Sequence, residues 1–412
     1  MFEFMDMDFN ANPANLTSGS YIPDAGECLR CGLCVSTCPT FRLQPINEET
    51  PRQRLRTISK ITVENQTIST QEREHLDNCL QCRACEAICP SQVAYGDLFD
   101  QTQALLAKTP PWQKKLAFWF IAHKAWRNRL LPLLSGYLKS GLQKPLRRSG
   151  LLDALGCRNA ESLLTPPALT PLKAYYPSPQ PVRGTVALFT GCLAEYFDCT
   201  TLQAATRLLN AIGYDVTVPA QQGCCGAIHQ HNGAYATDLI EQNLKVFNAL
   251  AVDAVVYAAS GCGAMLDSYK SADSEAARQF QHRLQDINAF LLQHWPDSLQ
   301  LRPLGQTVAV HEPCSQRHVL KNQQNVYKLL QKIPGLTVLP LADNAICCGA
   351  GGSYMLTHPN NAAQLRKLKQ QAIANTPADG TVSSNFGCTI FLNAYGLNIG
   401  NPLQLLAQQL PL

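Results

Sequence analysis

The sequence lacks a hydrophobic run that would cross a membrane. Its longest strongly apolar stretch, 116–122, is far shorter than the roughly 20 residues that a bilayer-spanning helix needs. The N-terminus, MFEFMDMDFN, also lacks the basic region and apolar core of a secretory leader. We therefore expect a cytoplasmic protein without a membrane-spanning segment.

Several function classes have no support in the sequence. The net charge is only +4 over 412 residues, whereas a nucleic-acid-binding domain is usually strongly basic, so we expect no nucleic acid partner. The glycines at 349–352 do not follow the G-x-G-x-x-G pattern, which predicts no flavin on this chain. Ser, His and Asp show no spacing typical of a hydrolytic triad, so no catalytic residue is nominated.

Cysteine is abundant by contrast, with 18 residues. In a reducing compartment, closely spaced cysteines are more often metal ligands or catalytic thiols than disulfides. Eight lie within 1–100, Cys157 stands alone in 101–183, and nine follow from 184 onward. This distribution predicts metal-binding or reactive thiols at both ends of a multidomain chain.

The N-terminal cysteines form two runs with the same spacing, C-x2-C-x2-C-x3-C-P. This pattern is typical of two-cluster bacterial ferredoxins, in which three thiolates of a run bind one [4Fe-4S] cluster and the fourth crosses to the other. Zinc is the alternative, but structural zinc usually takes its ligands as two separated pairs. The expected ligands are Cys28, Cys31, Cys34 and Cys89 for cluster 1, and Cys79, Cys82, Cys85 and Cys38 for cluster 2.

The region after 184 is an internal duplication. The segment LLNAIGYDVTVPAQQGCCG (208–226) parallels LLQKIPGLTVLPLADNAICCG (329–349). Apolar strands alternate with helical stretches such as 238–250 and 362–374, which predicts two α/β units with mainly parallel sheets. Ligands of such sheets bind beyond the carboxyl ends of the strands, where this pattern puts the cysteines.

Each half contributes four cysteines with a Cys-Cys-Gly turn at the centre. A Cys-Cys pair directs two thiols to one site only where the backbone bends sharply, and Gly226 and Gly349 allow that bend. Buried cysteines are also common as small hydrophobes, and a cluster, a zinc ion or redox thiols all stay open for these sites. The first quartet is Cys192, Cys224, Cys225 and Cys262, and the second quartet is Cys314, Cys347, Cys348 and Cys388.

Other residues near these loops have simpler interpretations. Four histidines are candidates for metal binding or proton relay, although a satisfied structural or surface histidine is the commoner case. They are His229, His231, His311 and His318. Cys157 and Cys199 fall outside both repeats and are expected to be unliganded.

The middle of the chain is basic and aromatic. Residues 101–152 carry ten Lys or Arg and no Asp or Glu, and a Pro-rich stretch at 166–181 predicts a linker. Basic residues interleaved with aromatics at 112–148 suit an interfacial helix against anionic lipid. Packing on a partner subunit or on the chain's own core is the equal alternative.

Taken together, the motifs carry a resemblance to a known family. The segments GCL (191–193), CCG (224–226), SGCG (260–263) and CCGAGGSYMLTHP (347–359) resemble the paired CCG domains of heterodisulfide reductase and its relatives. With CGLCVSTCPT (31–40), the layout is most similar to the iron-sulfur subunit of bacterial glycolate oxidase. One departure is that fuller CCG domains carry a fifth cysteine in C-x-x-C, where this sequence has Ala259 and Asn385.

The resemblance implies an α+β and α/β multidomain architecture. A helical ferredoxin-type domain with two [4Fe-4S] clusters would be followed by a basic helical connector with its linker and by two CCG domains, with a further cluster or metal allowed in the CCG region. The expected boundaries are 1–100, 101–183, 184–304 and 305–412.

The resemblance also implies an oxidoreductase role as an electron-transfer subunit. FAD-binding glycolate oxidase subunits would oxidise glycolate to glyoxylate, and this chain, peripheral on the inner face of the cell membrane, would pass the electrons toward a membrane quinone. The alternatives are the same relay for lactate or glycerol-3-phosphate dehydrogenase, a heterodisulfide-reductase-like thiol-disulfide reductase, and a metal-stabilised interaction module.

Overall fold

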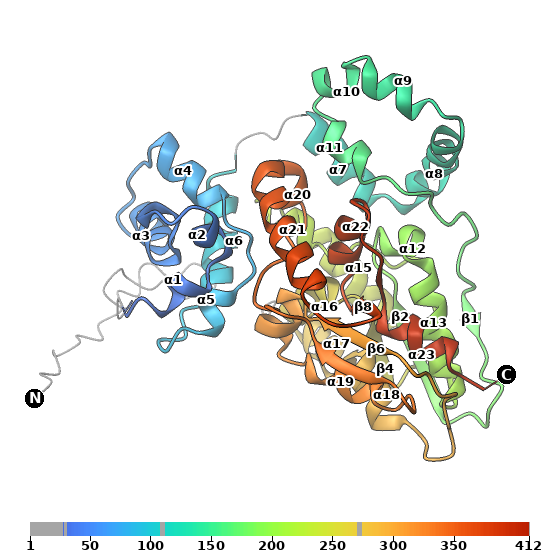
Figure 1. Ribbon diagram of the computed structural model, residues 1–412. Coiled ribbons are helices and arrows are strands. Elements are labelled where there is room, and N and C mark those ends of the chain that lie inside the picture. Colours follow the sequence, from blue (N-terminus) through green and yellow to red (C-terminus); the bar gives the residue numbers. More distant parts are fainter. Residues whose placement is uncertain (1–27, 29–30, 108–111, 270–273, 412) are drawn as a thin grey trace, which may run out of the picture.

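The computed structural model describes residues 28, 31–107, 112–269 and 274–411. Residues 1–10, for which the sequence predicts no secretory leader, lie outside these ranges. Figure 1 shows an N-terminal group of helices beside two α/β units, with further helices between them in sequence. In the described part of the chain, no helix is both long and apolar enough to span a bilayer.

The two longer early helices of the N-terminal group, α3 (Pro51–Thr62) and α4 (Thr70–Asp77), have clear start signals, and the group shares an apolar core. Thr50 caps the backbone NH of Gln53 with Pro51 in the first turn, and Ser69 and Glu72 form a capping box. The apolar faces meet in a core that includes Ile58, Leu76, Leu98 and Phe99. The elements are α1 Leu33–Thr37, α2 Pro39–Leu43, η2 Asn47–Glu49, α3 Pro51–Thr62, α4 Thr70–Asp77, α5 Ala84–Ala87 and α6 Tyr95–Leu105.

The basic segment forms several helices, not one. It comprises α7 Trp112–Ala122, α8 Lys124–Lys139, α9 Gln143–Arg148, α10 Leu151–Ala154 and α11 Arg158–Ser162. The Pro-rich stretch at 166–181 differs from a plain linker, because its residues β1 Tyr175–Tyr176 pair antiparallel with β3 as an edge strand. We call α7–α11 the connector.

The first α/β unit contains a five-stranded sheet with the order β1-β3-β2-β4-β5. All pairs except β1 with β3 are parallel, as the alternating pattern predicts. The strands are β2 Gly184–Phe189, β3 Tyr214–Thr217, β4 Ala254–Tyr257 and β5 Leu284–Asp286. The helices are α12 Ala194–Phe197, α13 Cys199–Ala211, α14 Ala227–Gln230, α15 Thr237–Asn248, α16 Ser260–Ser268, α17 Glu275–Arg283 and α18 Ile287–His294.

The second α/β unit repeats this plan with a four-stranded parallel sheet of order β7-β6-β8-β9. Its strands are β6 Thr307–His311, β7 Thr337–Pro340, β8 Gly380–Ser383 and β9 Ile399–Gly400. Its helices are the π-helix η4 Ser315–Leu320, α19 Gln324–Leu330, α20 Tyr354–Thr357, α21 Pro359–Ala374, α22 Phe386–Asn393 and α23 Pro402–Gln408. The predicted multidomain class, helical and then α/β, is confirmed.

One hydrophobic core joins the two sheets. Val186 and Val256 of the first sheet and Val310 and Val382 of the second belong to the same buried cluster. The opposite face of each sheet carries a separate cluster that contains cysteines of its own quartet. The two units are therefore fixed to one another on one side and present their cysteines on the other.

The Cys-Cys turns depend on glycine in both units. Gly226 has φ 95° and Gly349 has φ 91°, the left-handed region that side chains with a Cβ rarely adopt. A Cβ on Gly349 would lie 2.6 Å from the carbonyl oxygen of Ala362. The turn that aims Cys347 and Cys348 thus requires glycine for two independent reasons.

We expect Gly349→Ala to destabilise the fold by about 1–3 kcal/mol, because the new Cβ combines backbone strain with a clash. Thermal unfolding followed by circular dichroism measures the change. Gly380→Ala is the matched control, since Gly380 lies in β8 of the same unit and no heavy atom lies within 4 Å of its added Cβ. Equal unfolding temperatures for the two variants would contradict this account of the turn.

Candidate functional site

Four N-terminal cysteines from both runs line one small cavity. These are Cys38 from the first run and Cys79, Cys82 and Cys85 from the second. Desolvation raises the pKa of the Cys85 thiol well above its usual value, and the nearby Cys82, Cys79 and Cys38 add to the rise. The structure therefore brings together the four residues that the crossed-ligand pattern assigns to cluster 2.

The remaining N-terminal cysteines lie nearer the surface. Cys31 is exposed, while Cys28, Cys34 and Cys89 are half-buried. Burial raises the pKa of Cys34, and the neighbouring Cys28 and Cys31 contribute to that rise. Three members of the cluster 1 set are thus neighbours, whereas among the described residues no hydrogen bond joins the thiol of Cys89 to them.

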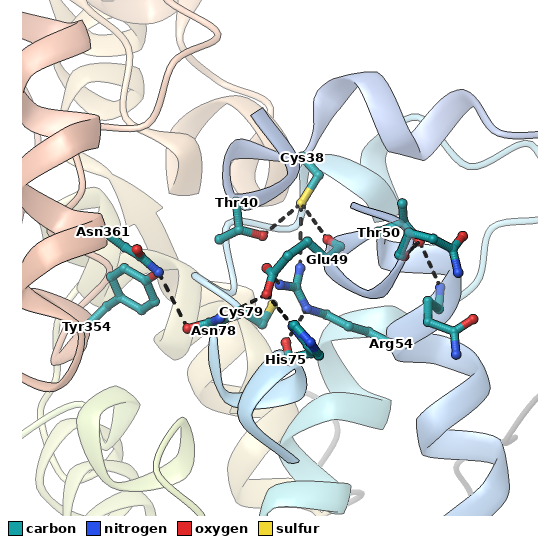
Figure 2. Close-up of polar contacts among 12 residues, drawn as sticks. Cys38, Thr40, Glu49, Thr50, Arg54, His75, Asn78, Cys79, Tyr354 and Asn361 are labelled. Atoms are coloured by element: carbon teal, nitrogen blue, oxygen red, sulfur yellow. Dashed lines mark hydrogen bonds and ion pairs between the residues drawn. The ribbon is translucent and has the colours of Figure 1, made fainter. Parts of the chain in front are cut away.

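A buried polar network supports the cluster 2 cysteines (Figure 2). Arg54 is 2% exposed; its Nη1 donates to Cys38 Sγ at 3.6 Å, and its guanidinium also forms an ion pair with Glu49. Glu49 further accepts hydrogen bonds from Asn78 at 2.8 Å and pairs with His75 at 2.7 Å. Burial alone would raise the pKa of Glu49, but the Arg54 charge and the hydrogen bonds from His75 and Asn78 lower it. The Arg54 guanidinium beside Cys38 is therefore paired with the ionised carboxylate of Glu49.

The first quartet lies at the carboxyl ends of β2, β3 and β4. Its thiols form a continuous row, because Cys224 contacts Cys192 on one side and Cys225 on the other, and Cys225 contacts Cys262. Two further side chains fix the turn itself. Asn243 Nδ2 donates to the carbonyl oxygen of Cys224 at 2.8 Å, and the Tyr269 hydroxyl donates to that of Cys225 at 2.8 Å.

The second quartet repeats this row in the other unit. Cys347 contacts Cys314 and Cys348, and Cys348 Sγ lies 3.1 Å from Cys388 Sγ. Asn385, which stands where a fuller CCG domain has its fifth cysteine, donates from Nδ2 to Cys388 Sγ at 3.3 Å. Its Oδ1 also accepts from the backbone NH of Gly261 at 3.1 Å, so this position links the two quartets.

The thiols of both quartets converge on one large cavity. Its volume is about 1100 Å³, and its walls include every cysteine of both quartets together with Cys79 and Cys82. Desolvation raises the pKa of Cys82, with Cys347 as the next contribution, which locates Cys82 beside the second quartet. Leu80 packs in the same buried cluster as Cys347 and Cys388. The second N-terminal run therefore docks on the second α/β unit.

The structure places the four histidine candidates as follows. His311 Nδ1 lies 2.9 Å from the Ser383 hydroxyl, and His231 Nδ1 lies 3.1 Å from the Asp100 carboxylate. The rings of His229 and Phe118 have centroids 4.8 Å apart. Burial lowers the pKa of His318 to about 4, so it is neutral at physiological pH. Of these four candidates, only His231 lines the large cavity.

The two remaining cysteines stand apart from these groups. Cys199 is buried at the start of α13, and Cys157 is half-buried between α10 and α11. Neither lines the large cavity. The supporting residues Glu49 and Arg54 gave no signal in the sequence, because no spacing rule connects them to the cysteines that they support. Asn385 was marked by the C-x-x-C spacing, but its contacts to Cys388 and Gly261 could not be read from it.

The chemistry of the N-terminal cysteines fits iron-sulfur clusters. In the described ranges, no three His, Cys, Asp or Glu side chains converge in the arrangement that would hold a single metal ion. A four-iron cluster takes one thiolate at each iron, so its ligands stand farther apart than those of one ion. A cavity lined by four thiols with a hydrogen-bonding guanidinium suits such a negatively charged group.

Known families match both halves of this arrangement. Residues 24–93 match the family described as a 4Fe-4S dicluster domain. Residues 186–267 and 308–393 each match the family described as a cysteine-rich domain, or CCG. The predicted iron-sulfur, ferredoxin-type and CCG assignments are thereby confirmed.

Whole-chain comparisons agree with these matches. The probable glycolate oxidase iron-sulfur subunit of Bacillus subtilis is 32% identical, covering 89% of this chain and 88% of its own length. The glycolate oxidase iron-sulfur subunit of Escherichia coli is 29% identical, with 90% coverage of both chains. Lactate utilization protein A of Geobacillus thermodenitrificans is 25% identical over 54% of this chain and 95% of its own.

Among solved structures, a hypothetical protein from Helicobacter pylori has a similar fold. It superposes with a TM-score of 0.50 at 12% identity, covering 87% of this chain and 67% of that one. The identity of nearly one third over almost the full length, together with the dicluster and paired CCG matches, shows that the chain belongs to the family of glycolate oxidase iron-sulfur subunits.

Proposed function

We propose that the chain is the electron-transfer subunit of a glycolate dehydrogenase complex. FAD-binding partner subunits oxidise glycolate to glyoxylate, a two-electron step, and this chain carries the electrons singly toward a membrane quinone. The observation that carries the proposal is the approach of Cys82 to the second quartet, because it gives electrons a continuous thiol-lined route. The named relatives support the choice of glycolate.

The proposed relay has two stages. The first comprises two [4Fe-4S] clusters with crossed ligands, namely Cys28, Cys31, Cys34 and Cys89, and Cys79, Cys82, Cys85 and Cys38. The second is a further cluster or metal on the quartets of the CCG region. We assign the first stage to residues 1–100 and the second to residues 184–304 and 305–412. Residues 101–183, which include the connector and the Pro-rich linker, lie between them.

Lactate is the second candidate donor, because lactate utilization protein A aligns over 95% of its own length. The relay chemistry would be the same, since the hydroxy acid reacts on the flavin subunit and not on this chain. Assaying the purified complex with glycolate, lactate and glycerol-3-phosphate separates these donors. Disulfide turnover without any flavoprotein would instead identify a thiol-disulfide reductase.

We further propose that the complex is cytoplasmic and lies on the inner face of the membrane through the connector. On α8, Trp126, Leu130 and Leu133 are exposed and spaced so that they share one helix face. Arg129 lies over the Trp126 ring, 5.4 Å from its centroid. Exposed apolar and basic side chains together suit an anionic lipid surface. We call the following residues the connector face: Trp112, Lys115, Leu116, Trp126, Arg129, Leu130, Leu133, Leu142, Lys144 and Arg148.

Cys31→Ala tests the relay directly. We expect the variant complex to reduce its flavin with glycolate at the normal rate but to lose reduction of the quinone acceptor, because an iron site of cluster 1 is missing. Stopped-flow flavin absorbance and steady-state acceptor reduction measure the two steps. Cys157→Ala is the control, since Cys157 lies outside all the cysteine groups. An equal loss of flavin reduction would overturn the relay assignment.

Cys38→Ala tests whether the ligands cross. With crossing, this variant loses the cluster bound by the second run, so its low-temperature EPR spectrum should match that of Cys79→Ala. Without crossing, the spectrum should match that of Cys31→Ala. Iron and sulfide analysis of anaerobically purified protein should show a loss of about one four-iron cluster in each variant.

Vesicle sedimentation tests the connector face. The chain should bind vesicles rich in phosphatidylglycerol and not neutral phosphatidylcholine vesicles, with binding reduced by salt. Leu133→Asp should weaken binding roughly tenfold, because it removes a leucine side chain that becomes buried in the lipid on binding. Val182→Asp is the control, as Val182 is also exposed but lies outside the connector face. Unchanged binding by Leu133→Asp would show that another surface meets the lipid, and a wild type that binds no vesicles would point to a protein subunit on the connector face.

A further inference from the structure

Arg127 is a buried cation whose hydrogen bonds are incomplete. Its side chain is 0% exposed, and Nη1 donates to the carbonyl oxygens of Phe120 and Ile121 at the end of α7. Among the described residues, its Nε and Nη2 have no hydrogen-bond partner. No carboxylate of the described residues forms an ion pair with it, and Glu195 pairs with Lys124. The guanidinium therefore lacks a direct ion-pair partner in the described part of the chain.

The first quartet lies beside this cation. The Arg127 guanidinium lies over the Tyr196 ring, 5.9 Å from its centroid, and Tyr196 in α12 is four residues after Cys192. A contact with Cys224 raises the pKa of Cys192, while the charge of Arg127 opposes that rise. The cation thus acts on the thiol that begins the first quartet.

Lys369 has the same relation to the second quartet. It is 0% exposed on α21, and Nζ donates only to the carbonyl oxygen of Asp343, at 3.3 Å. The carboxylate of Asp343 pairs instead with Arg42. Burial lowers the pKa of Lys369, and the nearby Cys348, Cys347 and Cys388 oppose that effect, with a smaller contribution from the Asp343 carboxylate. Among the described residues, no carboxylate forms an ion pair with this ammonium.

Arg54 shows that the two cases are unusual. It is equally buried and also contacts a cysteine, but Glu49 compensates its charge inside the protein. An uncompensated buried charge costs several kcal/mol. Neutral thiols do not offset that cost, whereas four thiolates around a metal centre carry the required negative charge.

We propose that Arg127 and Lys369 are the counter-cations of two anionic metal-thiolate centres, one on each quartet. The inference rests on the proposed function, because it locates the second stage of that relay on the CCG cysteines. On this inference the quartets are thiolate ligands and not neutral buried hydrophobes. Each CCG unit has its own cation, which comes from the connector in the first unit and from α21 in the second.

Metal analysis of the full chain, purified without oxygen, tests this inference. The wild type should contain more iron and sulfide than two four-iron clusters require. Arg127→Met and Lys369→Met should each lower retention of the additional iron about 10- to 100-fold against a chelator, because each removes the charge that stabilises one centre. The EPR signals of the N-terminal clusters should stay unchanged, which also shows that the variants fold.

Matched variants separate charge from packing. Arg127→Lys and Lys369→Arg keep the charge and should keep most of the additional iron. Arg283→Met should keep all of it, because Arg283 binds the carbonyl oxygens of Leu250 and Phe247 and contacts no thiol. Full iron retention by Arg127→Met and Lys369→Met would overturn the inference. A wild type holding only the N-terminal clusters would overturn it too, while the proposed electron relay through those clusters would stand.

Discussion

The buried carboxylate of Glu49 fixes the positions of the two N-terminal cysteine runs relative to one another. It binds Arg54, which reaches Cys38 at the end of the first run, and Asn78, which directly precedes Cys79 in the second. Asn78 also accepts a hydrogen bond from Asn361 of the second α/β unit, at 3.4 Å. Because breaking a buried ion pair costs several kcal/mol, the relative position of runs and unit is set by the protein and does not depend on the cluster alone.

The charge beside the two proposed clusters differs, and this difference favours one direction of electron flow. Cys31 is exposed, whereas Cys82 faces the second quartet across the large cavity. Arg54 places a positive charge and a hydrogen bond beside Cys38, and both stabilise the more negative, reduced state of a cluster. Electrons arriving at the surface cluster would therefore move toward the buried one, which adjoins the CCG thiols.

The sequence allowed the local chemistry to be predicted but not the contacts between domains. Strand periodicity and the Cys-Cys-Gly repeats located both quartets, because parallel strands bring their carboxyl ends to one edge. The convergence of Cys82 with Cys347 could not be predicted, since no local pattern encodes how a helical module docks on a sheet. The Asp100 contact to His231, the edge strand at 175–176 and the bridging role of Asn385 depend on tertiary packing in the same way.

Opposite faces of α8 in the connector differ: one is exposed and apolar, and the other is buried and carries Arg127. Trp126, Leu130 and Leu133 point to the surface, while Arg127 and Leu131 are buried. Since α8 carries both sets, any partner or lipid that repositions the exposed face also moves the guanidinium next to Cys192. The second unit differs, as its proposed cation Lys369 lies on its own helix α21. The two thiol rows are therefore similar, but the cation proposed for the first comes from a helix outside its unit, and the same helix carries an exposed apolar face.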